Sequence, residues 1–351
     1  MKNTYPQISC VIAAYNSEKT INKCLESIRT QEYSQDKITI ILVDGGSKDK
    51  TLAIAKRWKT QIIHSPPNLQ SAEYNKGIGV NAAKGEFLLF VDHDNILPHN
   101  KWLQNMLQPM LENKDVVGVE TLYIHYDRSY SLLDRYLALF GSLDPVAHYL
   151  GKVDKLLQGE TKHSLFGETK EYKFYFIVRF DPSFVPSIGS NGFLGRRKII
   201  VENADVRPSN FFHTDVQVDL IRKGFNAYAF IKDDIIHLTG YQNIRGFLAR
   251  RKLFMEQYHI KRHKLRRHSI FQPEDTWKLI KFIVYALTFV RPTYDAIKGY
   301  GKIRDRAWFL HPVLCFMFLM LYGYLTLKFT FQNYSKKIFP NKRVLITGRS
   351  G

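Results

Sequence analysis

Short apolar runs alternate with amphipathic stretches over the first third of the chain. Five short apolar runs predict strands at residues 8–14, 38–43, 61–64, 86–91 and 116–119, and the first of them is rich in β-branched residues. Between them, apolar residues at helical spacing predict helices that begin near residues 17, 50, 71 and 100. The strands are apolar throughout rather than alternating, as a parallel sheet covered on both faces requires. The sequence therefore predicts an α/β fold with a mostly parallel, Rossmann-like sheet flanked by helices.

The middle of the chain is harder to interpret. Residues 120–186 show little periodicity and many aromatics, which predicts loops and short helices over the sheet. Small residues at 186–198 indicate backbone close to a ligand or a tight turn. A helix is predicted at 214–223, and two short strands at 227–237.

A long apolar stretch lies near the C-terminus. Residues 307–327 are 21 residues without Asp, Glu, Lys or Arg, about the ~20 that cross a bilayer as a helix. Arg304, Arg306 and Lys328 bracket this stretch. We expect it to insert into a membrane. The alternatives are a re-entrant helix, a helix lying on the membrane surface and a buried amphipathic helix. The shorter apolar run at 280–290 is expected to be interfacial.

The charge balance indicates an anionic partner. The formal net charge is +19, and residues 245–268 hold nine Lys or Arg against the single acid Glu256. Because aromatic residues lie among these cations, nucleic-acid binding is one interpretation of this stretch. A charged helix face exposed to solvent is another. Because no recognised nucleic-acid module surrounds them, anionic lipid of the cytosolic leaflet, or the phosphate of a lipid-linked acceptor, is favoured, and no nucleic acid is expected.

Cysteine usage and the N-terminus bear on the compartment. Three cysteines without paired spacing favour a reducing environment. The first residues lack the pattern of a signal peptide. We therefore expect the N-terminal part on the cytoplasmic side of the cell membrane.

Polar residues follow three of the predicted strands. They are Tyr15 and Asn16 after the first, Asp44 after the second, and Asp92, His93 and Asp94 after the fourth. Ligands of open α/β sheets bind beyond the carboxyl ends of the strands. Two carboxylates two residues apart can face one hard cation together with phosphate oxygens, although a simple turn has the same composition.

Four segments together resemble a known family. VIAAYNSEKTINKCLESI, ILVDGGSKDKT, AEYNKGI and FVDHD are similar to the successive motifs of family-2 glycosyltransferases of the GT-A fold, in the expected order from about residue 8 to residue 94. The resemblance implies sugar transfer with inversion from a nucleotide-sugar donor, typically a UDP-sugar, to an acceptor hydroxyl, with Mg²⁺ or Mn²⁺.

The resemblance also implies roles for individual residues. The nucleotide-sugar would be bound by Ala14 and Tyr15 around the base, Asp44 on the base, Asn75 and Gly77 beside the nucleotide and ribose, and Asp92 on the ribose or metal side. Asp94 would bind the metal, with Asp92 beside it and His237 completing its shell. Ser190, Asn191 and Gly192 resemble the loop near acceptor and donor sugar.

The segment expected to supply the catalytic base departs from the family pattern. The family usually places an acidic pair at the start of a helix, where this sequence has Phe212-His213-Thr214-Asp215. Asp215 is the favoured base, with His213 and Asp219 as alternatives.

These inferences divide the chain into four parts. Residues 1–240 are expected to be the glycosyltransferase domain, with a nucleotide-sugar half at 1–119 and an acceptor half at 120–240. This domain is followed by a basic, amphipathic segment at 241–300, an apolar membrane helix at 301–335 and a tail at 336–351.

The expected acceptor is a lipid-linked glycan of surface polysaccharide or glycoprotein assembly. The alternatives are transfer onto polyprenyl phosphate and a catalytically silent membrane-bound scaffold of the same fold.

Overall fold

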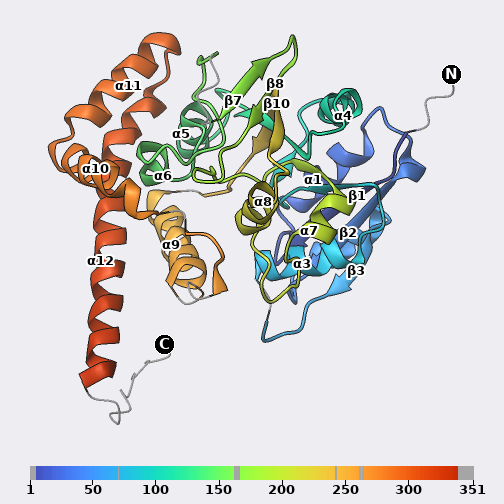
Figure 1. The fold of residues 1–351 in the computed structure, drawn as a ribbon, viewed down its shortest axis with the longest axis horizontal. Helices are drawn as coiled ribbons and strands as arrows, with labels where there is room; N and C mark the ends of the chain where they lie inside the picture. The colour runs from blue at the N-terminus through green and yellow to red at the C-terminus, as the bar shows by residue number, and fades with distance from the viewer. Residues whose placement is uncertain are drawn as a thin grey trace.

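A mostly parallel sheet forms the centre of the protein, seen here in a computed structural model (Figure 1). The structure describes residues 5–69, 71–161, 167–241, 243–260, 262, 265–269 and 271–338. The strands are β1 Ile8–Ala14, β2 Ile38–Asp44, β3 Gln61–His64, β4 Phe87–Phe90, β5 Asn95–Ile96, β6 Gly118–Ile124, β7 Glu168–Glu171, β8 Tyr175–Arg179, β9 Phe193–Arg196 and β10 Ala227–His237.

The strand order is β3-β2-β1-β4-β9-β6-β10-β8-β7, and the short β5 pairs with β10. Strands β1 to β4 run parallel to one another, β9 runs antiparallel between β4 and β6, and β10 is parallel to β6. This arrangement confirms the predicted α/β fold class. Because β1, β2 and β4 are parallel, their carboxyl ends meet at one edge of the sheet.

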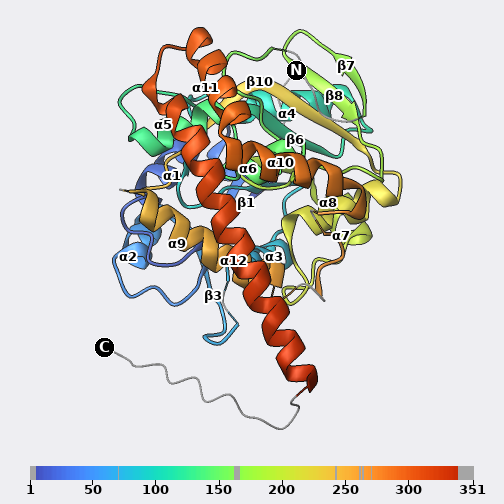
Figure 2. The same cartoon turned by 90° about the vertical axis from the view of Figure 1, so that its left-hand side faces the viewer.

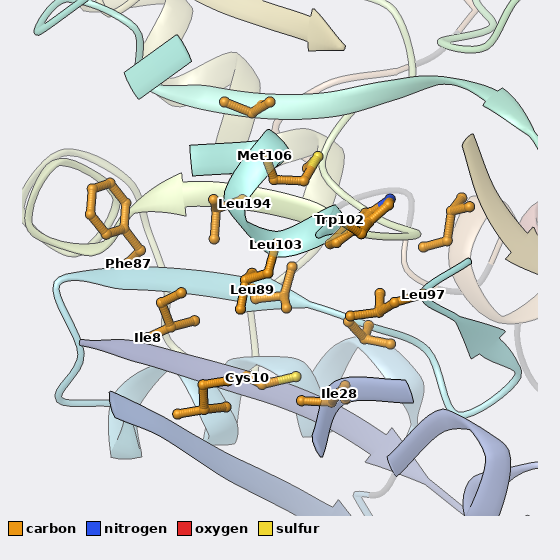
Figure 3. Close-up of a cluster of buried hydrophobic side chains, with 14 of the residues drawn as sticks. Ile8, Cys10, Ile28, Phe87, Leu89, Leu97, Trp102, Leu103, Met106 and Leu194 are labelled. Atoms are coloured by element: carbon orange, nitrogen blue, oxygen red, sulfur yellow. The ribbon is translucent and has the colours of Figure 1, made fainter. Parts of the chain in front are cut away.

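Helices cover both faces of the sheet. They are α1 Ile21–Arg29, α2 Thr51–Arg57, α3 Ala72–Ala82, α4 Trp102–Glu112, α5 Leu132–Phe140, α6 Pro145–Tyr149, α7 Arg197–Asn203 and α8 His213–Arg222. Along β1, Ile8, Cys10 and Ile12 belong to the buried cluster under α1, α2 and α4, while Val11 belongs to the cluster under α3, α7 and α8. Figure 3 shows part of the first cluster, where Trp102, Leu103 and Met106 of α4 pack over Leu89 and Leu194. Burial on both sides thus explains the mostly apolar run of β1.

Two sequence predictions need correction. Residues 120–186 contain the end of β6, the β7–β8 hairpin, α5 and α6, rather than only loops and short helices. Strand β7 is polar and exposed at the sheet edge, so no apolar pattern marks it. Residues 227–237 form one continuous strand, whose register shifts between Ile231 and Asp234, rather than two strands. A β-bulge places extra residues in one strand, which explains the polar interruption there.

The C-terminal helices pack on one side of the sheet domain. They are α9 Ile244–Phe254, followed by a π-helical turn at Met255–Ile260, α10 Thr276–Thr288, α11 Val290–Lys302 and α12 Leu310–Ile338. A buried cluster joins α5 to α9, α11 and the first half of α12 through residues such as Phe140, Phe247 and Trp308. Within the described residues, Arg306–Gln332 is long and apolar enough to cross a membrane, and an 18-residue window inside it has a mean hydropathy of 1.7. The C-terminal end of the predicted tail, residues 339–351, lies outside the described residues.

Candidate functional site

The polar residues that follow β1, β2 and β4 lie at one edge of the sheet, as the strand register requires. Ala14 pairs with Asp44 at the ends of β1 and β2, and Val11 pairs with Phe90 of β4. Ala14 is buried, whereas the Tyr15 side chain is 49% exposed. The edge therefore combines a buried floor with an exposed aromatic ring, which is a surface on which a planar ligand can stack.

Asp44 is buried at the end of β2 and organises the turn that follows. Its carboxylate accepts hydrogen bonds from the backbone N–H groups of Gly46 and Ser47, at 3.0 and 3.1 Å. His64, at the end of β3, places Nδ1 3.5 Å from Asp44 Oδ2. Asp44 therefore caps the turn that follows β2, and its carboxylate lies at the carboxyl end of that strand.

Asp94 and His237 come together through a non-local strand pairing. Strand β5 pairs antiparallel with the end of β10, where Asn95 lies opposite His237. Asp94 Oδ2 is consequently 3.6 Å from His237 Nε2. Burial opposes ionisation of both groups, but their mutual attraction outweighs it, lowering the pKa of Asp94 and raising the pKa of His237.

A buried charge network connects Asp92 to the start of α8. The Lys76 ammonium of α3 is 2.9 Å from Asp92 Oδ1 and 3.8 Å from Glu73 Oε1. Glu73 in turn accepts hydrogen bonds from the backbone N–H of His213 at 2.9 Å, and its Oε1 lies 3.0 Å from His213 Nδ1. Burial would raise the pKa of Glu73, yet the charges of His213 and Lys76 lower it to about 2. Burial would lower the pKa of Lys76, but Asp92 and Glu73 raise it. Glu73 and Lys76 are therefore both charged at neutral pH.

Sequence reasoning did not single out Glu73 and Lys76. Both belong to the segment AEYNKG, and both are buried, although Glu and Lys are rarely buried unless paired. An acid and a base three residues apart on a helix face each other, so the i, i+3 spacing was the available signal.

Asp215 is completely buried and already paired. The Arg266 guanidinium holds it in a bidentate contact with distances of 2.8 to 3.0 Å, and the backbone N–H of Arg267 donates to it at 2.9 Å. Asp219, one turn later, is paired with the Arg267 side chain at 2.9 Å. Two of the nine cations at residues 245–268 are thus neutralised by the acids of α8. A third, Arg251, pairs with Asp144 at 2.7 Å.

The loop that ends at Gly192 lies beside these groups. Gly192 has a φ of +87°, and its N–H donates to the carbonyl of Phe90 at the end of β4. An added Cβ at Gly189 would lie 3.2 Å from the carbonyl oxygen of His213. The predicted loop of Ser190, Asn191 and Gly192 therefore sits between the end of β4 and the start of α8. The Oδ1 atoms of Asn191 and of Asn75 are both buried and have no hydrogen-bond partner among the residues that the structure describes. Buried polar atoms of this kind are normally satisfied by a ligand or water.

Gly77 is required by close packing rather than by a turn. A Cβ at this position would lie 2.8 Å from both Phe211 Cβ and Pro208 Cα. Helix α3 can thus approach the segment before α8 only with glycine here.

Replacing Gly77 by alanine is expected to lower the free energy of unfolding by about 1–3 kcal/mol, because the added methyl overpacks this contact. Gly301 is the matched control, since a Cβ there meets nothing within 4 Å. Gly301→Ala is expected to leave stability unchanged or raise it by about 0.5–1 kcal/mol. Urea unfolding of both variants measures the difference, and equal stabilities would contradict the packing role.

The donor set at the edge fits a divalent cation. Mg²⁺ and similar ions are usually held by one or two protein carboxylates plus substrate phosphates rather than by an all-protein cage. Asp94 and His237 supply an oxygen and a nitrogen 3.6 Å apart, a spacing that two ligands of one cation can adopt. The Asp92 carboxylate contacts the Lys76 ammonium. Among the residues that the structure describes, no group of three ligating side chains is present.

Comparisons with known proteins indicate a glycosyltransferase. Residues 9–177 match the family model described as glycosyl transferase family 2. The chain is 32% identical over 108 residues to glycosyltransferase AglE of Haloferax volcanii, covering 30% of this chain and 35% of that protein. It is 31% identical over 150 residues to the putative glycosyltransferase EpsH of Bacillus subtilis, covering 41% and 42%. The chain thus spans less than half the length of these curated relatives.

A similar solved structure is the mannosyltransferase PcManGT from Pyrobaculum calidifontis in complex with GDP-Man and Mn²⁺. The TM-score is 0.48 at 14% identity, over 97% of this chain and 89% of that one.

Proposed function

Residues 9–177 are a glycosyltransferase family 2 domain, and from this premise we propose that the protein transfers a sugar from a UDP-sugar to an acceptor hydroxyl with inversion. The proposed acceptor is a lipid-linked glycan, reached from the cytoplasmic side of a membrane. The observation that carries the proposal is the Asp94–His237 pair beside Asp92 at the carboxyl edge of the sheet.

The donor would bind across the ends of β1, β2 and β4. Tyr15 offers an exposed ring for stacking on the base, and Asp44 offers a carboxylate that can accept from the imide N–H of uracil. The unpaired Asn75 Oδ1 is available for a ribose hydroxyl. These three groups would fix the nucleotide and leave its diphosphate near Asp92 and Asp94.

Asp94 and His237 would hold the divalent metal, with Asp92 on the ribose side. A bound Mg²⁺ or Mn²⁺ supplies positive charge for the departing diphosphate. Lys76 fixes the position of the Asp92 carboxylate, since its ammonium is 2.9 Å from Asp92 Oδ1. The chain therefore brings its own buried cation to the side of the site where negative charge develops.

His213 is the base that we propose for the acceptor hydroxyl. Its Nδ1 lies 3.0 Å from Glu73, so a proton on Nδ1 leaves Nε2 as the proton acceptor. Asp215, the base favoured by the sequence, is bound by Arg266 on both oxygens and would have to lose that partner before taking a proton. Glu73 would orient the imidazole and stabilise its charged form after proton transfer.

Transfer onto polyprenyl phosphate is the second candidate. It is favoured by the pairing of Asp215, because an attacking phosphate oxygen needs no strong base.

The test is an assay of purified full-length protein with a panel of nucleotide-sugars, lipid-linked glycan acceptors and polyprenyl phosphate. We expect release of UDP and transfer of label to the lipid-linked glycan. Label on polyprenyl phosphate alone would support the second candidate, and release of no nucleoside diphosphate with any acceptor would contradict both.

A further inference from the structure

Helices α10, α11 and α12 lie together on one side of the molecule, which faces the viewer in Figure 2. Each helix buries one stripe and exposes another. The exposed stripes are apolar: Trp277, Ile280, Val284 and Leu287 on α10, Val290, Tyr294 and Ile297 on α11, and Val313, Met320, Tyr324, Leu327 and Phe331 on α12. Successive members are three, four or seven residues apart, so each stripe follows one side of its helix.

The exposed fractions are large for apolar side chains, at 63% for Trp277, 71% for Val290 and 73% for Leu327. Three adjacent helices that leave whole apolar stripes in water form a surface that requires a partner. We define Trp277, Ile280, Val284, Leu287, Val290, Tyr294, Ile297, Val313, Met320, Tyr324, Leu327 and Phe331 as the apolar face.

The charges around the apolar face indicate which partner this is. Residues 276–332 contain eight Lys or Arg and two acids, Asp295 and Asp305. Both acids are already paired: Asp295 with Arg291 at 3.0 Å, and Asp305 with Arg135 at 3.0 Å. Two of the cations also have acidic partners outside this segment: Lys302 is 2.6 Å from Glu160, and Lys278 is 3.7 Å from Asp275. An apolar surface bordered by the remaining excess of cations matches an anionic lipid leaflet, whose headgroups attract the cations while its acyl chains bury the stripes.

The inner side of α12 argues against a spanning helix. His311 lies within hydrogen-bond distance of the hydroxyls of Tyr136 and Tyr149, at 3.0 and 2.9 Å. Farther along, the Tyr322 hydroxyl donates to Asp144, which also pairs with Arg251. If α12 crossed a bilayer along this length, it would have to abandon these partners or carry an Asp–Arg pair into hydrocarbon, which is costly.

The part of α12 that follows Tyr322 is too short to span a bilayer by itself. Only 16 residues of the helix follow Tyr322, and Lys328 is among them, whereas a span needs about 20 mostly apolar residues. We propose that α10, α11 and α12 bind in the plane of an anionic lipid leaflet through the apolar face, and that α12 does not cross it. This inference does not depend on the sugar chemistry.

Depth measurements on vesicles test the orientation. Single cysteines replace Val313, Met320 and Leu327 in the full chain, and spin labels report their depth in vesicles of phosphatidylcholine and phosphatidylglycerol. The labels are selective because the native Cys10, Cys24 and Cys315 are buried. In-plane binding predicts equal, shallow depths at the three sites. A spanning helix predicts a change of about 10 Å for every seven residues, and that gradient would overturn the proposal.

Flotation with the same vesicles tests the surface itself. Ile280→Glu/Ile297→Glu should weaken vesicle binding by roughly 100-fold. The reason is that two apolar side chains, which the lipid would bury, are replaced by negative charges that the leaflet repels. The matched control is Leu111→Glu/Phe174→Glu, at 62% and 55% exposed positions outside the apolar face, and it should bind like the wild type. Urea unfolding and circular dichroism of both variants measure whether they are folded. Equal flotation of both variants, or a dimer formed through the apolar face with no vesicle binding, would overturn the proposal.

Discussion

Asp94→Asn is expected to lower kcat/KM for the nucleotide-sugar donor by about 10³-fold. The asparagine keeps the size of the side chain but removes the charge that, in the proposed site, holds the metal beside the diphosphate. Release of nucleoside diphosphate by the purified full-length variant measures the effect.

Asp233→Asn is the matched control for this substitution. Asp233 is also paired with a histidine, at 2.9 Å from His99, and its side chain is as exposed as that of Asp94, at 18% against 20%. The control should retain activity close to that of the wild type. Equal losses in the two variants would mean that the effect comes from breaking a carboxylate–histidine pair on the fold rather than from the donor site.

His213→Gln is expected to lower kcat by about 10² to 10⁴, with a smaller change in KM, because a general base contributes by that factor to the chemical step. Glutamine can still hydrogen-bond to Glu73 but cannot take a proton at neutral pH. His125→Gln is the control, since His125 forms a similar pair with Asp234 at 2.8 Å and has no role in the proposed site. Activity of His213→Gln within a few-fold of the wild type would contradict the assignment of His213 and favour an acceptor that needs no base, such as polyprenyl phosphate.

The sheet was predictable because its strands are buried on both faces. Residues such as Cys10, Val11 and Ile12 are apolar whichever face they serve, and the runs therefore stand out in the sequence. The β7–β8 hairpin was missed because an edge strand such as Glu168–Glu171 is polar and carries no such pattern. The bulge in β10 was mistaken for a break because Lys232 and Asp233 interrupt the apolar run.

The carboxylates of the site could be expected from their positions after parallel strands, but their partners could not. His237 reaches Asp94 only because two residues of β5 pair with the end of β10, a contact more than 140 positions apart in the sequence. Arg266 reaches Asp215 across 51 positions, and nothing local in either segment marks the pair. Such contacts are set by the tertiary fold. A sequence pattern records which residues are polar, but it does not record which of them meet.

Calorimetric titration of the full-length protein with UDP, GDP and other nucleoside diphosphates, with and without Mn²⁺, tests the central claim most directly. We expect UDP to bind in the presence of Mn²⁺, to bind much more weakly after chelation of the metal, and to lose its metal-dependent binding in Asp94→Asn while Asp233→Asn keeps it. Failure of the folded protein to bind any nucleoside diphosphate would contradict a donor site at this edge of the sheet and favour a catalytically silent scaffold of the same fold.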